Sequence, residues 1–229
     1  MPSNGSLFIE GSTKMSPGNQ LVVLLGPDGS GKSTIADMLV ERLQAEGRTA
    51  RHYPHRFGIL PALSSFLFRF SASAREDRSE LSNFKPIYDL KENSRLRSFI
   101  YVCWYGLDYL IGGIFMKVGP FFGRKKTVAI FARYFYDYYY QSNNRKLPDV
   151  IKKIVENIVP TPSAIFFLDR DPEEIHAGKP ELPVEEILWQ QQKIQMVMSR
   201  YPQYQVIDAR KGAAQTVEVI YQILKKQWA

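Results

Sequence analysis

Short apolar runs alternate with amphipathic segments along most of this chain. The runs of strand length lie at residues 21–25, 49–53, 127–131, 164–168 and 205–207. Apolar residues recur at helical spacing over residues 33–43, 95–118, 147–159, 184–201 and 213–226, and Pro172 marks the first turn of one more helix. Strands that alternate with helices predict a parallel sheet that binds ligands at the carboxyl ends of its strands. The turns at Gly26, Arg133 and Asp208 should therefore face one crevice.

A glycine-rich loop of defined spacing follows the first apolar run. Gly26 and Gly31 are separated by four residues, and Lys32 and Ser33 come next. This spacing predicts a phosphate-binding loop rather than a simple hairpin turn, because glycines allow positive φ angles and let backbone N–H groups approach an anion. The helix that begins there adds its partial positive charge. We expect the loop to bind ATP through Gly26, Asp28, Gly29, Ser30, Gly31, Lys32, Ser33 and Thr34.

Two side chains of this loop have a predicted role in phosphoryl transfer. Lys32 should contact the β- and γ-phosphates, and the hydroxyl of Ser33 should complete the ligand shell of a bound Mg²⁺. The loop alone indicates a nucleotide-binding protein and does not identify its reaction.

Composition favours one folded domain that handles anions. The chain has 229 residues, 45% of them hydrophobic, and a formal net charge of +7. This charge suits a nucleotide, a nucleic acid or an anionic membrane surface, although scattered basic residues make nucleic acid the weaker candidate. The single cysteine, Cys103, excludes an internal disulfide, and its apolar helical setting favours a buried, inert thiol.

The chain divides into a polar tail and a single domain. We expect residues 1–19 to form a flexible tail and residues 20–229 the domain. The tail shows no signal-peptide pattern, so we expect a cytoplasmic protein. Residues 98–116 contain one formal charge, Asp108, and a charge at the centre of a bilayer is costly, so a buried or partner-facing helix is favoured over a span. The helix at 95–118 leaves open a homodimer and a contact with the inner face of a membrane.

Two segments have more than one interpretation. Residues 54–93 lack a sustained period and indicate an insertion or cover. At the end of the second strand, just before and within its start, His52, His55 and Arg56 either bind an acidic acceptor or form a solvated basic loop. The aromatic residues of 134–140 either stack on a substrate ring or pack the sheet, with packing favoured. Asp137 either orients Arg133 or lies exposed at the surface.

Four local motifs resemble the thymidylate kinase-like branch of the nucleoside monophosphate kinases. They are the loop at 26–34, Arg133-Tyr134-Phe135-Tyr136-Asp137, Gly178-Lys179-Pro180-Glu181-Leu182 and Val206-Ile207-Asp208-Ala209. The chain is most similar to divergent members that accompany polysaccharide and lipopolysaccharide biosynthesis. The resemblance implies an α/β P-loop fold of three layers, with a five-stranded parallel sheet in the order 2-3-1-4-5, helices on both faces and a short lid at about 178–183.

The resemblance also implies roles for individual residues. Asp28 would face the acceptor, Arg133 would hold its anionic group or the transferring phosphoryl, and Lys179 would close over the phosphates. Asp208 and Ala209 would lie beside the adenine. Two positions depart from the family pattern: Ala132 replaces an aspartate before the arginine, and Gly178 replaces an arginine in the lid.

Together these patterns predict a cytoplasmic enzyme that moves the γ-phosphoryl group of MgATP to a nucleoside monophosphate or a glycan acceptor. Lys32, Asp28, Arg133 and Lys179 are the expected catalytic residues. The two departures support an alternative, in which the chain binds nucleotide but serves as a weakened or inactive subunit of envelope glycan assembly.

Overall fold

A computed structural model describes residues 19–63, 94–119 and 125–228 of the chain. Most of the predicted tail and residues 64–93 of the predicted insertion lie outside the described residues. The strands are β1 (Gln20–Leu25), β2 (Ala50–Tyr53), β3 (Val128–Phe131), β4 (Ala164–Asp169) and β5 (Tyr204–Asp208). The helices are α1 (Lys32–Ala45), α3 (Arg95–Val118), α4 (Asp137–Tyr140), α5 (Asp149–Glu156), α6 (Pro172–Gly178), α7 (Val184–Met198) and α8 (Ala213–Trp228), with a 3₁₀ turn η2 (Ser142–Asn144) after α4.

The five strands form one parallel sheet in the order β2-β3-β1-β4-β5, which confirms the expected fold. All residues of β1 and β3 are buried, as expected for strands covered on both faces. The central strand β1 pairs with β3 through Val23 and Phe131 and with β4 through Leu25 and Phe167. The carboxyl ends of these strands therefore meet at one edge, where the chain leaves β1 as the glycine-rich loop.

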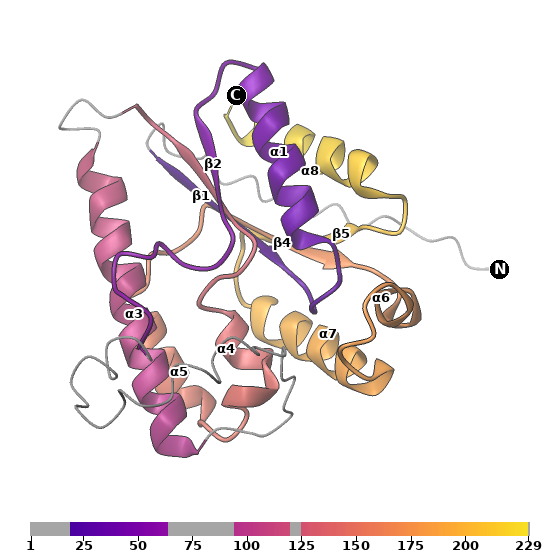
Figure 1. Cartoon of the computed structure of the whole chain (residues 1–229). Helices are drawn as coiled ribbons and strands as arrows, with labels where there is room; N and C mark the ends of the chain where they lie inside the picture. Colours follow the sequence, from indigo (N-terminus) through magenta and orange to yellow (C-terminus); the bar gives the residue numbers. More distant parts are fainter. Residues whose placement is uncertain (1–18, 64–93, 120–124, 229) are drawn as a thin grey trace, which may run out of the picture.

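Alternation along β1 divides the core into two layers of side chains. Val22 and Leu24 pack with α1 and α8, whereas Leu21, Val23 and Leu25 pack with residues of α3, α4, α5 and α7. Figure 1 shows the first pair of helices on one face of the sheet and the larger group on the other. This is the three-layer arrangement that the resemblance to thymidylate kinase-like proteins implies.

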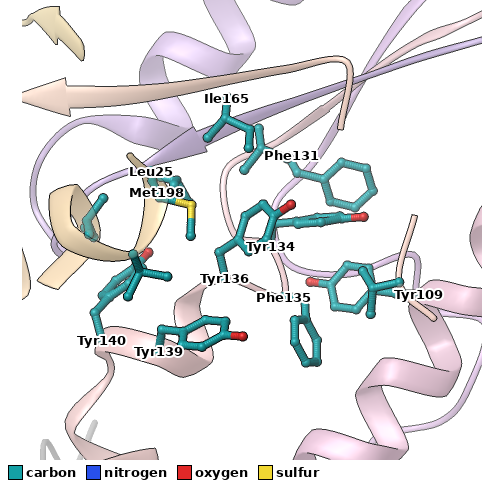
Figure 2. Packing of buried hydrophobic residues seen from close by; sticks show 14 of the residues in the cluster. Leu25, Tyr109, Phe131, Tyr134, Phe135, Tyr136, Tyr139, Tyr140, Ile165 and Met198 are labelled. Atoms are coloured by element: carbon teal, nitrogen blue, oxygen red, sulfur yellow. The ribbon is translucent and has the colours of Figure 1, made fainter. Parts of the chain in front are cut away.

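The aromatic residues after β3 are part of the core. Tyr134, Phe135 and Tyr136 are almost fully buried, and Tyr109 of α3 packs edge-on against Tyr134 with ring centroids 4.7 Å apart. Figure 2 shows these rings together between the sheet and the helices. The Tyr134 hydroxyl donates to the Pro160 carbonyl, so its polar end is satisfied. The packing interpretation is therefore correct, and substrate stacking has no support from these rings.

The charge of Asp108 within the apolar helix α3 is compensated by hydrogen bonds and an ion pair. Its side chain is fully buried and accepts hydrogen bonds from the backbone N–H of Leu60 at 2.7 Å and of Gly58 at 3.1 Å. Arg56 adds an ion pair at 3.1 Å. The carboxylate thus fixes the segment after β2 to α3, and Phe57 of that segment packs so closely that a Cβ on Gly112 would overlap its ring.

Among the described residues, α3 is the single helix long and apolar enough, by length and composition, to cross a membrane. A third of its most apolar window is buried in the domain, and its one acidic residue is the buried Asp108. The buried side of α3 is therefore a core element, as the sequence favours. Cys103 is half-buried and packs against the same core, and burial raises the pKa of its thiol.

Replacing Asp108 with alanine should destabilise the fold through its loop contacts. We expect the free energy of unfolding in urea to fall by about 2–4 kcal/mol, because Arg56 and two backbone N–H groups lose their partner. Glu174→Ala is the matched control, because Glu174 pairs with Arg170 on an exposed surface, and its loss should change stability by no more than about 1 kcal/mol. Equal effects of the two substitutions would contradict a structural role for Asp108.

Candidate phosphate-binding site

The glycine-rich loop has the backbone geometry that its spacing predicts. Gly29 and Gly31 have φ angles of 92° and 89°, values that residues with a Cβ rarely adopt. A Cβ on Gly26 would lie 2.5 Å from the hydroxyl oxygen of Ser30, so the loop could not close around a larger residue there. Gly31 forms the N-terminal boundary of the 14-residue helix α1, which directs its unpaired N–H groups into the loop.

Lys32 lies inside this loop. Its ammonium group donates to the carbonyl oxygens of Gly26 and Pro27, each at 2.7 Å, and lies 3.7 Å from the Asp28 carboxylate. Only 7% of the side chain is exposed. Burial lowers the pKa of Lys32, although Asp28 and Asp137 oppose the shift. The ammonium group is therefore positioned within the loop by two carbonyl oxygens, and a phosphate oxygen could replace them as its hydrogen-bond acceptor.

Asp28 and Arg133 join the loop to the end of β3. The Arg133 guanidinium donates to Asp28 at 2.7 Å. Burial alone would raise the pKa of Asp28, but Lys32 and Arg133 outweigh it and the pKa is lowered. Burial likewise opposes the charge on Arg133, yet Asp28 and Asp137 raise its pKa further above the ordinary arginine value. Both groups are charged, and the structure brings these two predicted residues into direct contact.

Asp137 is the functional candidate whose position the sequence leaves open. It is 5% exposed, so the surface interpretation is wrong, and its hydrogen-bond donor is the Tyr140 hydroxyl. Burial raises the pKa of Asp137 to about 6, although Arg133 and Lys32 oppose the shift. Arg133 makes its hydrogen bond with Asp28, so the predicted bond between Asp137 and Arg133 is replaced by a longer electrostatic attraction.

The segment expected to act as a lid lies on the phosphate-binding loop. A Cβ on Gly29 would be 3.2 Å from both Lys179 and Ile175, so α6 and the residue after it pack on that glycine. Ile175, Leu182 and Ile187 form a small core beneath the segment. The charge of Lys179 acts on Asp28 and Lys32, while its ammonium group pairs with Glu181 at 2.7 Å. The predicted site residue Lys179 therefore belongs to the same group of charges.

The two departures from the family pattern occupy different surroundings. Ala132 is 1% exposed and packs with the core on the α1 side of the sheet. Gly178 ends α6, and a Cβ there would meet no atom within 4 Å. A larger side chain at residue 178 therefore fits without moving its neighbours, whereas one at residue 132 must enter a packed core.

The end of β2 adds a histidine to the site. Tyr53 pairs with Phe131, so His55 and Arg133 each lie two residues beyond paired positions on adjacent strands. Partial burial lowers the pKa of His55, and Arg133 and Arg56 lower it further. Two neighbouring basic residues have acidic partners, His52 with Asp37 at 2.7 Å and Arg56 with Asp108. His55, in contrast to these two residues, lies beside the cationic Arg133.

Asp208 and Ala209 lie at the same sheet edge, two strands from β1. Asp208 is exposed, and hydrogen bonds from Arg210 lower its pKa to about 2. Ala209 is buried, and its N–H donates to the Asp169 carbonyl at 2.9 Å. Their described contacts do not join them to the phosphate-binding loop, so their role beside an adenine stays a prediction.

The loop residues fit a nucleotide phosphate and its magnesium ion. The hydroxyl of Ser30 is buried and has no hydrogen-bond partner among the described residues, which leaves a donor and acceptor available within the loop. Ser33 and Thr34 are exposed on the first turn of α1, beside Lys32. Ser33 is the residue that would hold a Mg²⁺ ion bound together with phosphate oxygens. The described part of the chain contains no group of three acidic, histidine or cysteine side chains that could hold a metal.

Comparison with solved structures places this arrangement among known folds. The chain is similar to thymidylate kinase from Ehrlichia chaffeensis, with a TM-score of 0.55 and 16% sequence identity over 91% of this chain and 100% of that one. This likeness shows a thymidylate kinase-like fold. Searches against protein-family models and curated protein sequences give no match.

Asp137→Asn should change how stability depends on pH. The folded pKa of about 6 exceeds the reference value of 3.8, so the folded protein binds the extra proton and loses stability as pH rises through this interval. Asparagine does not ionise. Between pH 4 and pH 7 the free energy of unfolding of Asp137→Asn, relative to that of wild type, should therefore rise by on the order of 3 kcal/mol. Urea unfolding at each pH measures this difference.

Asp149→Asn provides a control with the opposite sign. Burial opposes ionisation of Asp149, but Lys193 and Lys152 outweigh it and its pKa is lowered. The wild type therefore gains stability as pH rises from the folded pKa through the reference value of 3.8, so below about pH 4 the free energy of unfolding of this variant should fall relative to wild type as pH rises. A pH-independent effect of Asp137→Asn would contradict a raised pKa at Asp137.

Proposed function

We propose that this protein is an ATP-dependent phosphotransferase. The observation that carries the proposal is the buried Lys32 inside a glycine loop of the required geometry, with Asp28, Arg133 and Lys179 around it. Phosphoryl transfer depends on positioning and charge neutralisation more than on covalent chemistry, and these residues supply both. The thymidylate kinase-like fold is a further support.

The site brings together three cations that an anionic ligand could contact. Lys32, Arg133 and Lys179 carry three positive charges, and the carboxylates of Asp28, Asp137 and Glu181 are their acidic partners. A bound phosphate chain would compete with Asp28 for Arg133 and with two carbonyls for Lys32. Mg²⁺ bound with ATP would neutralise further charge on the phosphate oxygens and orient them.

The same charges suggest which acceptor the site suits. In the transfer, an acceptor oxygen forms a bond to the γ-phosphorus while the bond to the bridging oxygen of ADP breaks. Ala132 provides no carboxylate to remove a proton, but a phosphate acceptor is already ionised and needs none removed. We therefore propose an acceptor that carries a phosphate group, as a nucleoside monophosphate or a phosphorylated glycan does, held by Arg133 beside His55.

Ala132 and Gly178 favour a second candidate function. A chain that lacks an acid and a lid arginine can bind MgATP without turning it over, as a regulatory subunit would. Saturable ATP binding with no transfer to any acceptor would support this function.

Lys32→Ala should reduce transfer of labelled γ-phosphate at least about a hundredfold, because it removes the buried cation of the loop. The transfer assay offers two pools of acceptors, nucleoside monophosphates and an envelope glycan extract. The variant Ala132→Asp is assayed with the same two pools. Lys226→Ala, an exposed lysine on α8, should have no effect. Unchanged transfer and unchanged ATP binding in Lys32→Ala would contradict the proposed function.

Gly178→Arg should raise the transfer rate by at least about tenfold, because it adds a cation beside Lys179 where an added side chain meets no atom. The gain should be in kcat, with little change in the KM for ATP, since the charge acts mainly in the transition state. Gly178→Ala is the matched control and should leave the rate unchanged. An equal rate in both variants would show that residue 178 does not face the transferred group.

A further inference from the structure

Exposed apolar side chains concentrate on one part of the molecule. Among the described residues, 15 large hydrophobic side chains are exposed, and ten of them lie on α3 or on the α5 segment through Ile158. Single exposed hydrophobic residues are ordinary, but a concentration on two packed helices marks an interaction surface. We call this surface the α3–α5 face.

The helical spacing places these residues on one side. Leu96, Ile100, Leu107, Ile114 and Val118 follow each other along α3 at intervals that keep them within a single stripe. The stripe runs for roughly 33 Å at the helical rise per residue. The opposite side of α3, with Val102 and Tyr109, is buried in the core, so the stripe faces away from the domain.

A second stripe on α5 continues this surface. Val150, Ile154 and Ile158 recur every four residues and are 69%, 64% and 47% exposed. The two helices are in direct contact, because a Cβ on Gly106 of α3 would overlap the side chain of Val155 on α5. Figure 1 shows α5 beside α3, on the side of the sheet away from α1 and α8.

The exposed charged residues of α3 are all positively charged. Arg95 and Arg97 are exposed in its first turn and Lys117 in its last, whereas its single carboxylate, Asp108, is buried. Lys125 and Lys126 are exposed shortly after the helix, and the whole chain has a net charge of +7. An apolar stripe with cations at both ends is complementary to a surface of anionic lipid.

We propose that the α3–α5 face binds the surface of a membrane that contains anionic lipids, with α3 lying in the plane of the interface. The contacts of α3 with the core hold it on the domain, which is incompatible with a span. A second copy on the same face is disfavoured because cations occupy both ends of α3, so either orientation of paired helices would bring like charges together.

Vesicle flotation tests this proposal with the full chain. Wild type should bind vesicles of phosphatidylcholine mixed with phosphatidylglycerol, more weakly at high salt, and should bind phosphatidylcholine vesicles at least about tenfold less. Ile114→Glu on α3 and Ile154→Glu on α5 should each reduce binding at least about tenfold. Val219→Glu, which replaces a similarly exposed residue on α8, is the matched control and should bind as wild type does.

Lys32→Ala should also bind vesicles as wild type does, so the result does not depend on the proposed phosphoryl transfer. Light scattering of the same samples without lipid reports the oligomeric state. Absence of binding by wild type, or binding that Ile114→Glu and Ile154→Glu leave intact, would overturn the proposal. A dimer that both substitutions dissociate would overturn it in favour of a second copy on the face.

Discussion

The buried ammonium group of Lys32 is the interaction on which the architecture of the site depends. Removing a charge from water is costly, and here two carbonyl oxygens and the nearby carboxylates compensate for that cost. The carbonyls can converge only if the chain turns sharply after β1, which requires the positive φ angles of Gly29 and Gly31. The carboxylates come from the loop and from α4, so the parallel sheet must bring the ends of β1 and β3 together.

The strands and the phosphate-binding loop could be predicted from local patterns in the sequence, whereas the strand order followed from the resemblance to thymidylate kinase-like proteins. Apolar runs indicated the strands, and the spacing from Gly26 to Ser33 indicated the loop. The placement of Asp137 could not be predicted, because one helical turn from Arg133 allows either contact or exposure. Its burial follows from tertiary packing of α4 under the sheet. A carboxylate in the middle of an aromatic run was the available signal, since such a charge must find partners when the rings are buried.

Asp108 was equally hard to place from the sequence. As a charge within an apolar helix it argued against a span, but its partners are backbone N–H groups of Gly58 and Leu60, about fifty residues earlier. No periodicity encodes a contact between a helix and an irregular segment. The same limit applies to the resemblance with kinases, which suggested roles for Arg133 and Lys179 but not their contacts with Asp28 and Glu181.

The position of Asp108 has a thermodynamic consequence. One face of α3 is exposed and apolar, while its buried face holds the segment that begins at His55 through Asp108 and through the Tyr109 hydroxyl, which donates to the His55 carbonyl at 3.3 Å. A ligand that displaced the His55 backbone would therefore have to break this hydrogen bond or move Tyr109 of α3 with it. If binding at one end of this connection changes affinity at the other, linkage requires that the two changes be equal.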